Sequence, residues 1–192
     1  MANKVLLDEV DGTPAAITFR DTTDYSPTAA NDLRHASAVD VEVQIDCTSL
    51  ADSAYRQSTK ADLGVVRAPL YRLRGAIEFA ATPVSGQPVF AYWAPSQHAT
   101  AANGNPGNAT GADAAWDGYS SDGDVVIGQL DMIGIFINSG EATTTVQVGE
   151  FGSFSPSERY GSLIIRNESG AAFHSDMAET HFVLDPVYSE IQ

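Results

Sequence analysis

VDVEVQID, residues 39–46, places an apolar side chain at every second position. Its valines and its isoleucine share one face, and Asp40, Glu42 and Gln44 lie on the other. YRLRGAIEF, residues 71–79, repeats the pattern, with two arginines and a glutamate opposite its aromatic and aliphatic side chains. A period of two residues is typical of antiparallel strands that have one face in the core and one in water.

Further segments have the composition of strands, and clusters rich in Gly, Pro, Asn and Ser separate them. They are residues 15–19, 54–64, 88–94, 124–138, 143–151, 160–166 and 180–188. No segment has a convincing amphipathic helix pattern, although parts of 28–36 or 49–61 have room for a helical turn. About eight or nine strands within residues 15–192 predict one all-β domain, either an antiparallel β-sandwich or a closed barrel. Residues 1–14 are predicted to form an N-terminal arm that orders against a neighbour, with a frayed terminus as the alternative.

A thirty-residue tract, residues 95–124, follows the strand-like run 88–94 and has no Lys, Arg, Glu, Leu, Ile, Val or Phe. Such a long connection is uncommon in a compact domain. Burial of apolar surface offsets the conformational entropy of ordering, and the tract offers only two large apolar anchors. We therefore expect a long inter-strand loop that is ordered mainly by contacts outside its own sheets. Its candidate contact residues are Asn105, Pro106, Gly107, Trp116 and Tyr119.

The charges of the chain are unevenly distributed. The net charge is −15 and the pI is about 4.3, which argues against binding to nucleic acid or to an anionic membrane. Between residues 56 and 74, five basic residues accompany one acidic residue. This basic strip is either a solvated surface or a contact with an oppositely charged partner, and the second interpretation predicts a homo-oligomer, with a trimer favoured. The strip consists of Arg56, Lys60, Arg67, Arg72 and Arg74.

The single cysteine, Cys47, cannot form a disulfide within the chain and is expected to be a small buried side chain. The first residues lack the apolar core and cleavage site of a signal peptide, and no apolar stretch approaches the length of a membrane helix. We expect the chain to fold in a reducing cytoplasm.

Two segments combine metal-ligating residue types. In HSDMAETH, His174, Asp176, Glu179 and His181 could bind a transition metal, and a surface turn is the favoured alternative. In DGYSSDGD, weak calcium candidates compete with an ordinary turn, because the spacing is not that of an EF-hand loop. The calcium candidates are Asp117, Asp122 and Asp124. We expect no cofactor.

Catalytic motifs give no support for an enzyme. The sequence has no GxSxG elbow and no GxxxxGK[ST] loop, and no helix pattern follows the glycines near residue 107. The acidic residues are too numerous for pairs of carboxylates to be informative. Phe90, Tyr92 and Trp93 could form a sugar platform, but alternation places Trp93 on the opposite face, and a core role for at least one face is expected.

Four runs resemble segments of small virion structural proteins from tailed bacteriophages. They are AATPVSGQPVFAYWAPSQHATAANGNPGNATGADAAW (80–116), QLDMIGIFI (129–137), FSPSERYGSLIIRNESGAAFHSD (154–176) and LDPVYSEIQ (184–192). The resemblance is to the overall pattern and covers roughly residues 50 to 192. The nearest functional picture is that of capsid decoration (cement) proteins, which are small β-sandwich or jelly-roll proteins, often trimeric.

The resemblance implies a jelly-roll-like sandwich and a non-enzymatic protein of the capsid surface. Such a protein is made in the host cytoplasm and binds the major capsid protein on the outside of the assembled head. The alternative is a carbohydrate- or host-surface-binding module of a phage fibre or another virion appendage.

Overall fold

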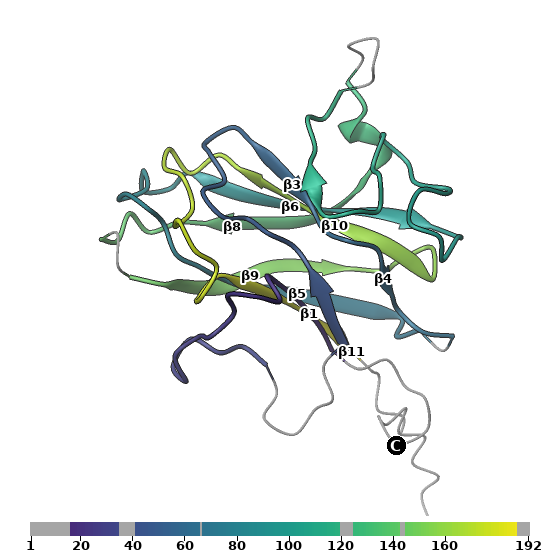
Figure 1. The fold of residues 1–192 in the computed structure, drawn as a ribbon, viewed down its shortest axis with the longest axis horizontal. Coiled ribbons are helices and arrows are strands. Elements are labelled where there is room, and N and C mark those ends of the chain that lie inside the picture. The colour runs from purple at the N-terminus through teal and green to yellow at the C-terminus, as the bar shows by residue number, and fades with distance from the viewer. Residues whose placement is uncertain (1–15, 35–40, 66, 120–124, 143–144, 188–192) are drawn as a thin grey trace, which may run out of the picture.

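The protein consists of two stacked β-sheets (Figure 1). The computed structural model describes residues 16–34, 41–65, 67–119, 125–142 and 145–187. The five-stranded sheet has the order β2-β1-β11-β5-β9, and the six-stranded sheet has the order β7-β3-β10-β6-β8, with β4 also paired to β10. The strands are β1 (Ile17–Arg20), β2 (Val41–Gln44), β3 (Tyr55–Gln57), β4 (Ala61–Asp62), β5 (Leu70–Ile77), β6 (Pro88–Ser96), β7 (Ala114–Ala115), β8 (Asp131–Ile137), β9 (Gln147–Phe154), β10 (Tyr160–Asn167) and β11 (His181–Val187).

The strand order is that of a jelly roll. Leaving out β2 and the two-residue strands β4 and β7, eight strands remain, and they pair first with last, second with seventh, third with sixth and fourth with fifth. These four antiparallel pairs are β1–β11, β3–β10, β5–β9 and β6–β8. This pairing results when a long hairpin of two chain halves is rolled into two sheets. The predicted all-β, jelly-roll-like sandwich is confirmed.

The structure differs from the prediction in detail. Among the described residues, nine strands have three or more residues, in agreement with the expected eight or nine, while the weak segment 54–64 divides into β3 and β4. One pair, β1–β2, is parallel. Within segment 124–138, a short 3₁₀ turn, η2 (Ile127–Gln129), precedes β8. The proposed arm, residues 1–14, lies outside the described residues. Among the described residues, no helix is long and apolar enough to cross a membrane.

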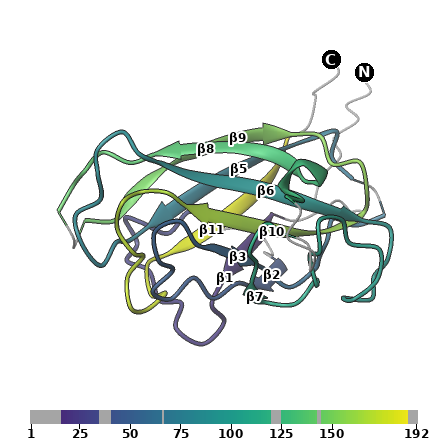
Figure 2. The ribbon, with the colours of Figure 1, turned by 90° about the horizontal axis from the view of Figure 1, so that it is seen from above.

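The core fills the space between the two sheets, whose strands lie across one another when seen from above (Figure 2). The alternation in β5 is confirmed, because Tyr71, Leu73 and Ile77 are fully buried. Trp93 of β6 is also fully buried and packs edge-on against Phe19 from the opposite sheet. Cys47 belongs to this core, as expected.

Candidate functional site: the outer face of the six-stranded sheet

A row of side chains crosses the outer face of the six-stranded sheet. The strand registers place Ile135 of β8 beside Phe90 of β6, then Arg166 of β10, then Tyr55 of β3. The Arg166 guanidinium lies 5.6 Å from the centre of the Phe90 ring and 5.1 Å from that of Tyr55. Cation–π attraction therefore holds the aromatic rings and the guanidinium in one continuous layer.

The rest of this outer face has a covered part and an open part. Ile164 of β10 is fully buried on this outer face, because the long loop and the turn before β8 pack over it. On β8, three aliphatic side chains remain open to solvent: Met132 is 49% exposed, Ile135 39% and Ile137 58%. We call these three residues the β8 stripe. A hollow of about 560 Å³ between β8 and β9 begins at Ile137.

The near part of the long loop folds around one ammonium group. Four oxygens lie 2.9–3.0 Å from Nζ of Lys60, and each accepts a hydrogen bond from it. They are Oγ of Ser96 and the carbonyl oxygens of His98, Thr100 and Asn103. The loop thus closes around the ammonium of Lys60, a residue between β3 and β4, in the way that carbonyl oxygens surround a hard metal ion.

The far part of the loop is held by Trp116. Its indole Nε1 donates to the carbonyl oxygen of Gly107 at 2.8 Å, and its ring packs edge-on against Tyr55. Together with Ala109, Val126 and Leu130 it forms a second hydrophobic cluster on the sheet. The expectation that the loop lacks sufficient anchors on its own domain is therefore wrong, because the ammonium and the small cluster supply them.

The five loop residues proposed as partner contacts divide by exposure. Gly107 and Trp116 are buried against each other inside the chain. Asn105 and Pro106 are half-buried, and Tyr119 is 51% exposed. Only the last three are placed to reach a partner.

The basic strip is used mainly within the chain. Arg56 binds Asp113 of the loop at 2.6 Å, and this hydrogen bond raises the pKa of the guanidinium above its usual value. Arg74 and Arg72 of β5 lie 2.6 and 3.6 Å from the buried carboxylate of Asp185 on β11. Arg67, by contrast, is exposed. As four of the five cations stabilise loop or strand pairings, they offer little charge to an outside partner.

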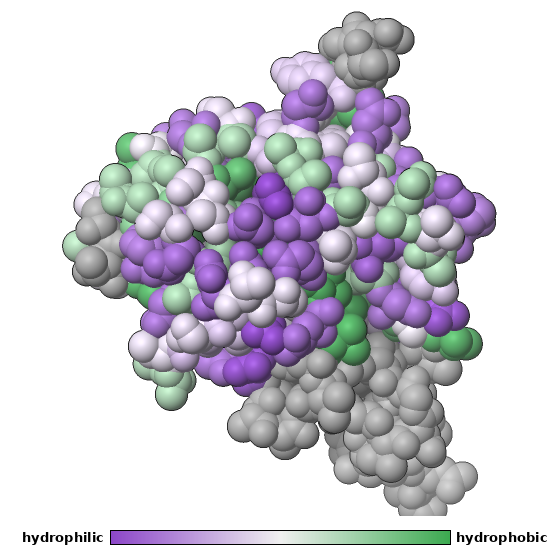
Figure 3. Space-filling view, in the orientation of Figure 1, coloured by the Kyte–Doolittle hydropathy of each residue, from purple (hydrophilic) through white to green (hydrophobic). Residues whose placement is uncertain are grey.

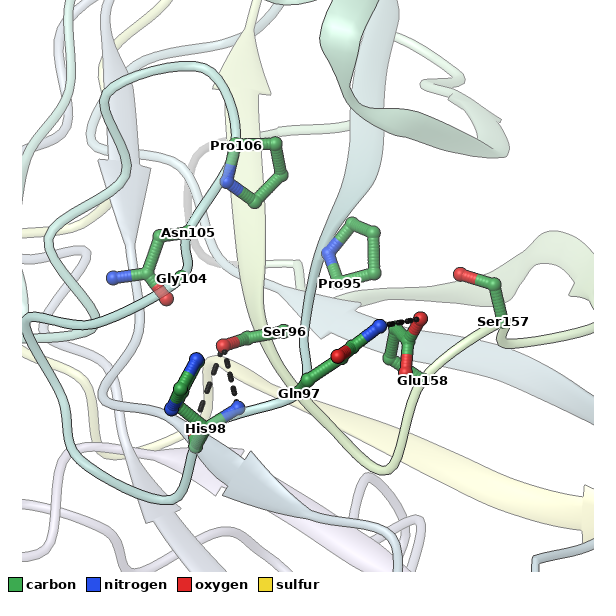
Figure 4. A pocket seen from close by; sticks show the side chains of 9 residues that line it. All are labelled: Pro95, Ser96, Gln97, His98, Gly104, Asn105, Pro106, Ser157 and Glu158. Carbon is green, nitrogen blue, oxygen red and sulfur yellow. Dashed lines mark hydrogen bonds between the residues drawn. The ribbon is translucent and has the colours of Figure 1, made fainter.

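Three of the clefts between described residues border the loop, and the two larger ones differ in their lining. The first, about 440 Å³, lies between the loop and the β9–β10 turn, and Gln97 crosses it to donate to Glu158 at 3.1 Å (Figure 4). His98 stands on its opposite wall (Figure 4). The second cleft, about 540 Å³, is aromatic and charged, and its lining includes Tyr55, Trp116, Tyr119, Arg166 and Glu168.

The metal candidates of the sequence have separate outcomes. Asp117 accepts the amide of Tyr119 in an ordinary turn, and Asp122 and Asp124 lie outside the described residues. In HSDMAETH, His181 is buried and accepts the amide of Leu33, while Glu179 binds Thr28 and Asn31. His181 and Glu179 therefore hold the segment 21–34 against the sandwich. They do not form one ligand group with His174 and Asp176.

No protein-family model matches the chain, and no curated protein matches it.

Proposed function

We propose that the protein is a non-enzymatic structural protein of a tailed-phage virion, a capsid decoration protein that binds the outside of the head. The resemblance of four sequence runs supports the assignment to a phage particle. The jelly-roll topology, which occurs in viral capsid domains, is compatible with this assignment.

The observation that carries the proposal is the β8 stripe. Three aliphatic side chains stand open on one strand at the edge of a sheet, in a chain of net charge −15. By contrast, the side of the sandwich seen in Figure 3 is mainly hydrophilic across its centre. Contiguous exposed apolar groups of this kind mark protein–protein contacts. The described part of the loop next to the stripe is held by Lys60 and Trp116, so its contact with a partner would cost little conformational entropy.

The size of the expected effect follows from the exposure of the stripe. Full burial of an aliphatic side chain contributes about 1.5–3 kcal/mol, so completing the burial of three half-exposed ones contributes about 2–4 kcal/mol. A loss of about 2 kcal/mol weakens binding about 30-fold. A carboxylate placed in the contact loses this contribution and adds the penalty of a buried charge.

The test begins with purified particles of the phage that encodes the chain. Quantitative mass spectrometry should find the chain in a copy number comparable with that of the major capsid protein. Heads from a phage that lacks the gene should bind the added recombinant chain, and the Ile135→Asp/Ile137→Asp variant should bind at least about 30-fold more weakly.

Val65→Asp is the matched control, because Val65 is 80% exposed in the connection between β4 and β5, away from the stripe. It should bind as the unchanged chain does. A few copies per particle, or equal binding by the stripe variant and the control, would contradict the proposal. Light scattering on the same samples tests the trimer.

The aromatic cleft favours a second candidate function, the binding of a host glycan. Tyr119 is half-exposed at its rim, while Arg166 and Glu168 offer polar groups beside the Tyr55 ring. Aromatic faces with a few fixed polar groups are typical of ligand sites. A glycan array followed by calorimetry tests it: a Tyr119→Ala variant should lose binding, and no bound glycan on the array would remove this candidate.

A further inference from the structure

The geometry points to a divalent transition-metal site formed by Glu78, His174 and Asp176. These residues come from two segments that lie far apart in the sequence, the end of β5 and the connection between β10 and β11. One ligand atom from each lies within 4.8 Å of the other two. The site is independent of the β8 stripe and of the proposed function.

Two carboxylate oxygens approach one imidazole nitrogen. Nδ1 of His174 lies 3.2 Å from Oδ2 of Asp176 and 4.0 Å from Oε2 of Glu78. Donor atoms around a zinc ion at bond lengths of about 2.0–2.2 Å stand a little over 3 Å apart, so small side-chain rotations bring this set to bonding distance. Each of the three residues is half-buried, which leaves room for water as a further ligand.

The charge balance also calls for a cation. Among the residues that the structure describes, His174 is the only basic residue with a side chain within 4.0 Å of the Glu78 or Asp176 carboxylate. The Glu78 side chain is only 15% exposed, and the carboxylates of Glu78 and Asp176 approach the same imidazole. A divalent ion would carry the positive charge that balances two carboxylates.

The backbone holds the ligands in place before any ion binds. The amide of His174 donates to the carbonyl oxygen of Glu78 at 2.9 Å. Phe79, which follows Glu78, pairs with Phe173, which precedes His174. Their rings pack edge-on, with the ring centres 5.5 Å apart. Preorganised ligands of this kind favour binding because little conformational entropy is lost when the ion binds.

The ligand chemistry selects the class of metal. Imidazole suits zinc, copper, iron and nickel, while calcium requires six to eight oxygen ligands. One imidazole and two carboxylates therefore favour Zn²⁺, with Co²⁺ as its spectroscopic substitute. Bound metal would join the end of β5 to the β10–β11 connection.

The test uses the full chain after treatment with a chelator. Calorimetry with Zn²⁺ should give one equivalent per chain, and Co²⁺ should give a visible absorption band. His174→Ala and Glu78→Gln should each abolish the band and lower the affinity at least 10-fold, whereas His98→Ala, which changes an exposed histidine elsewhere, should keep both.

Circular dichroism confirms that each variant is folded, and NMR on the unchanged chain reads the site directly through the shift of the His174 ring signals on adding Zn²⁺. Absence of stoichiometric binding by the unchanged chain overturns the proposal. Binding that survives in both His174→Ala and Glu78→Gln overturns it as well.

Discussion

Replacing Lys60 with methionine tests how the long loop is ordered, because the change keeps the apolar stem and removes the ammonium. Three protons on Nζ serve four oxygens at 2.9–3.0 Å. A typical hydrogen bond contributes about 0.5–1.5 kcal/mol net, and one made by a charged group about 1.5–3 kcal/mol. In the variant, the carbonyl oxygens at exposed positions accept hydrogen bonds from water instead. We therefore apply the lower range to three bonds and expect the ordered loop to lose about 2–3 kcal/mol of stability.

This loss should be local, since Lys60 contacts the loop through Nζ and the two sheets keep their own core. Hydrogen exchange read by mass spectrometry should accelerate about 30- to 150-fold in peptides covering residues 96–111, with β5 and β6 unchanged. Arg67→Met, which removes an exposed cation of the same strip, is the control. Unchanged exchange in the loop of Lys60→Met would refute the view that the ammonium organises it.

Three further outcomes are expected. Gly111→Ala should destabilise the protein in urea by about 1–3 kcal/mol more than Gly86→Ala: both glycines have positive φ, but a Cβ at Gly111 would lie 2.3 Å from the carbonyl oxygen of Ala101, whereas one at Gly86 meets nothing within 4 Å. Burial lowers the pKa of His181 below 6.5, so the unfolded chain takes up a proton first and the free energy of unfolding should fall as the pH drops from 6.5 to about 5. His181→Gln should flatten that slope in a pH series of urea titrations, and an identical slope would contradict this cause. Cys47 is fully buried and burial raises the pKa of its thiol, so a thiol reagent should modify it only as fast as the chain unfolds; rapid labelling of the native protein would show otherwise.

The parts of the fold that depend on a two-residue period could be predicted from the sequence. The buried face of β5 and the opposite faces of Phe90 and Trp93 follow directly from alternation. The parallel pairing of β1 with β2 could not be predicted in this way, since parallel and antiparallel strands share the same period. The strand β7 is only two residues long and exists because it pairs with β3, so its own composition carries no signal.

The candidate sites were harder to predict, because their members are distant in the sequence. The carbonyl oxygens that bind Lys60 belong to the backbone, and no residue type reveals them. The segment HSDMAETH drew attention to His174 and Asp176, but their third partner, Glu78, comes from another strand and was missed. Its position at the end of an alternating strand, on the polar face, was the only available signal.

The fate of the basic strip changes the expected nature of any contact with a partner. The sequence suggested that opposite charges join the copies of the chain, yet Arg56, Lys60, Arg72 and Arg74 all bind groups of their own chain. What remains is a chain of net charge −15 that leaves the uncharged β8 stripe open to solvent. Charge-driven association weakens steeply with added salt, while burial of apolar side chains does not. Binding to heads through the stripe should therefore persist at high salt, and like-charge repulsion between acidic copies should make added salt favour assembly rather than oppose it.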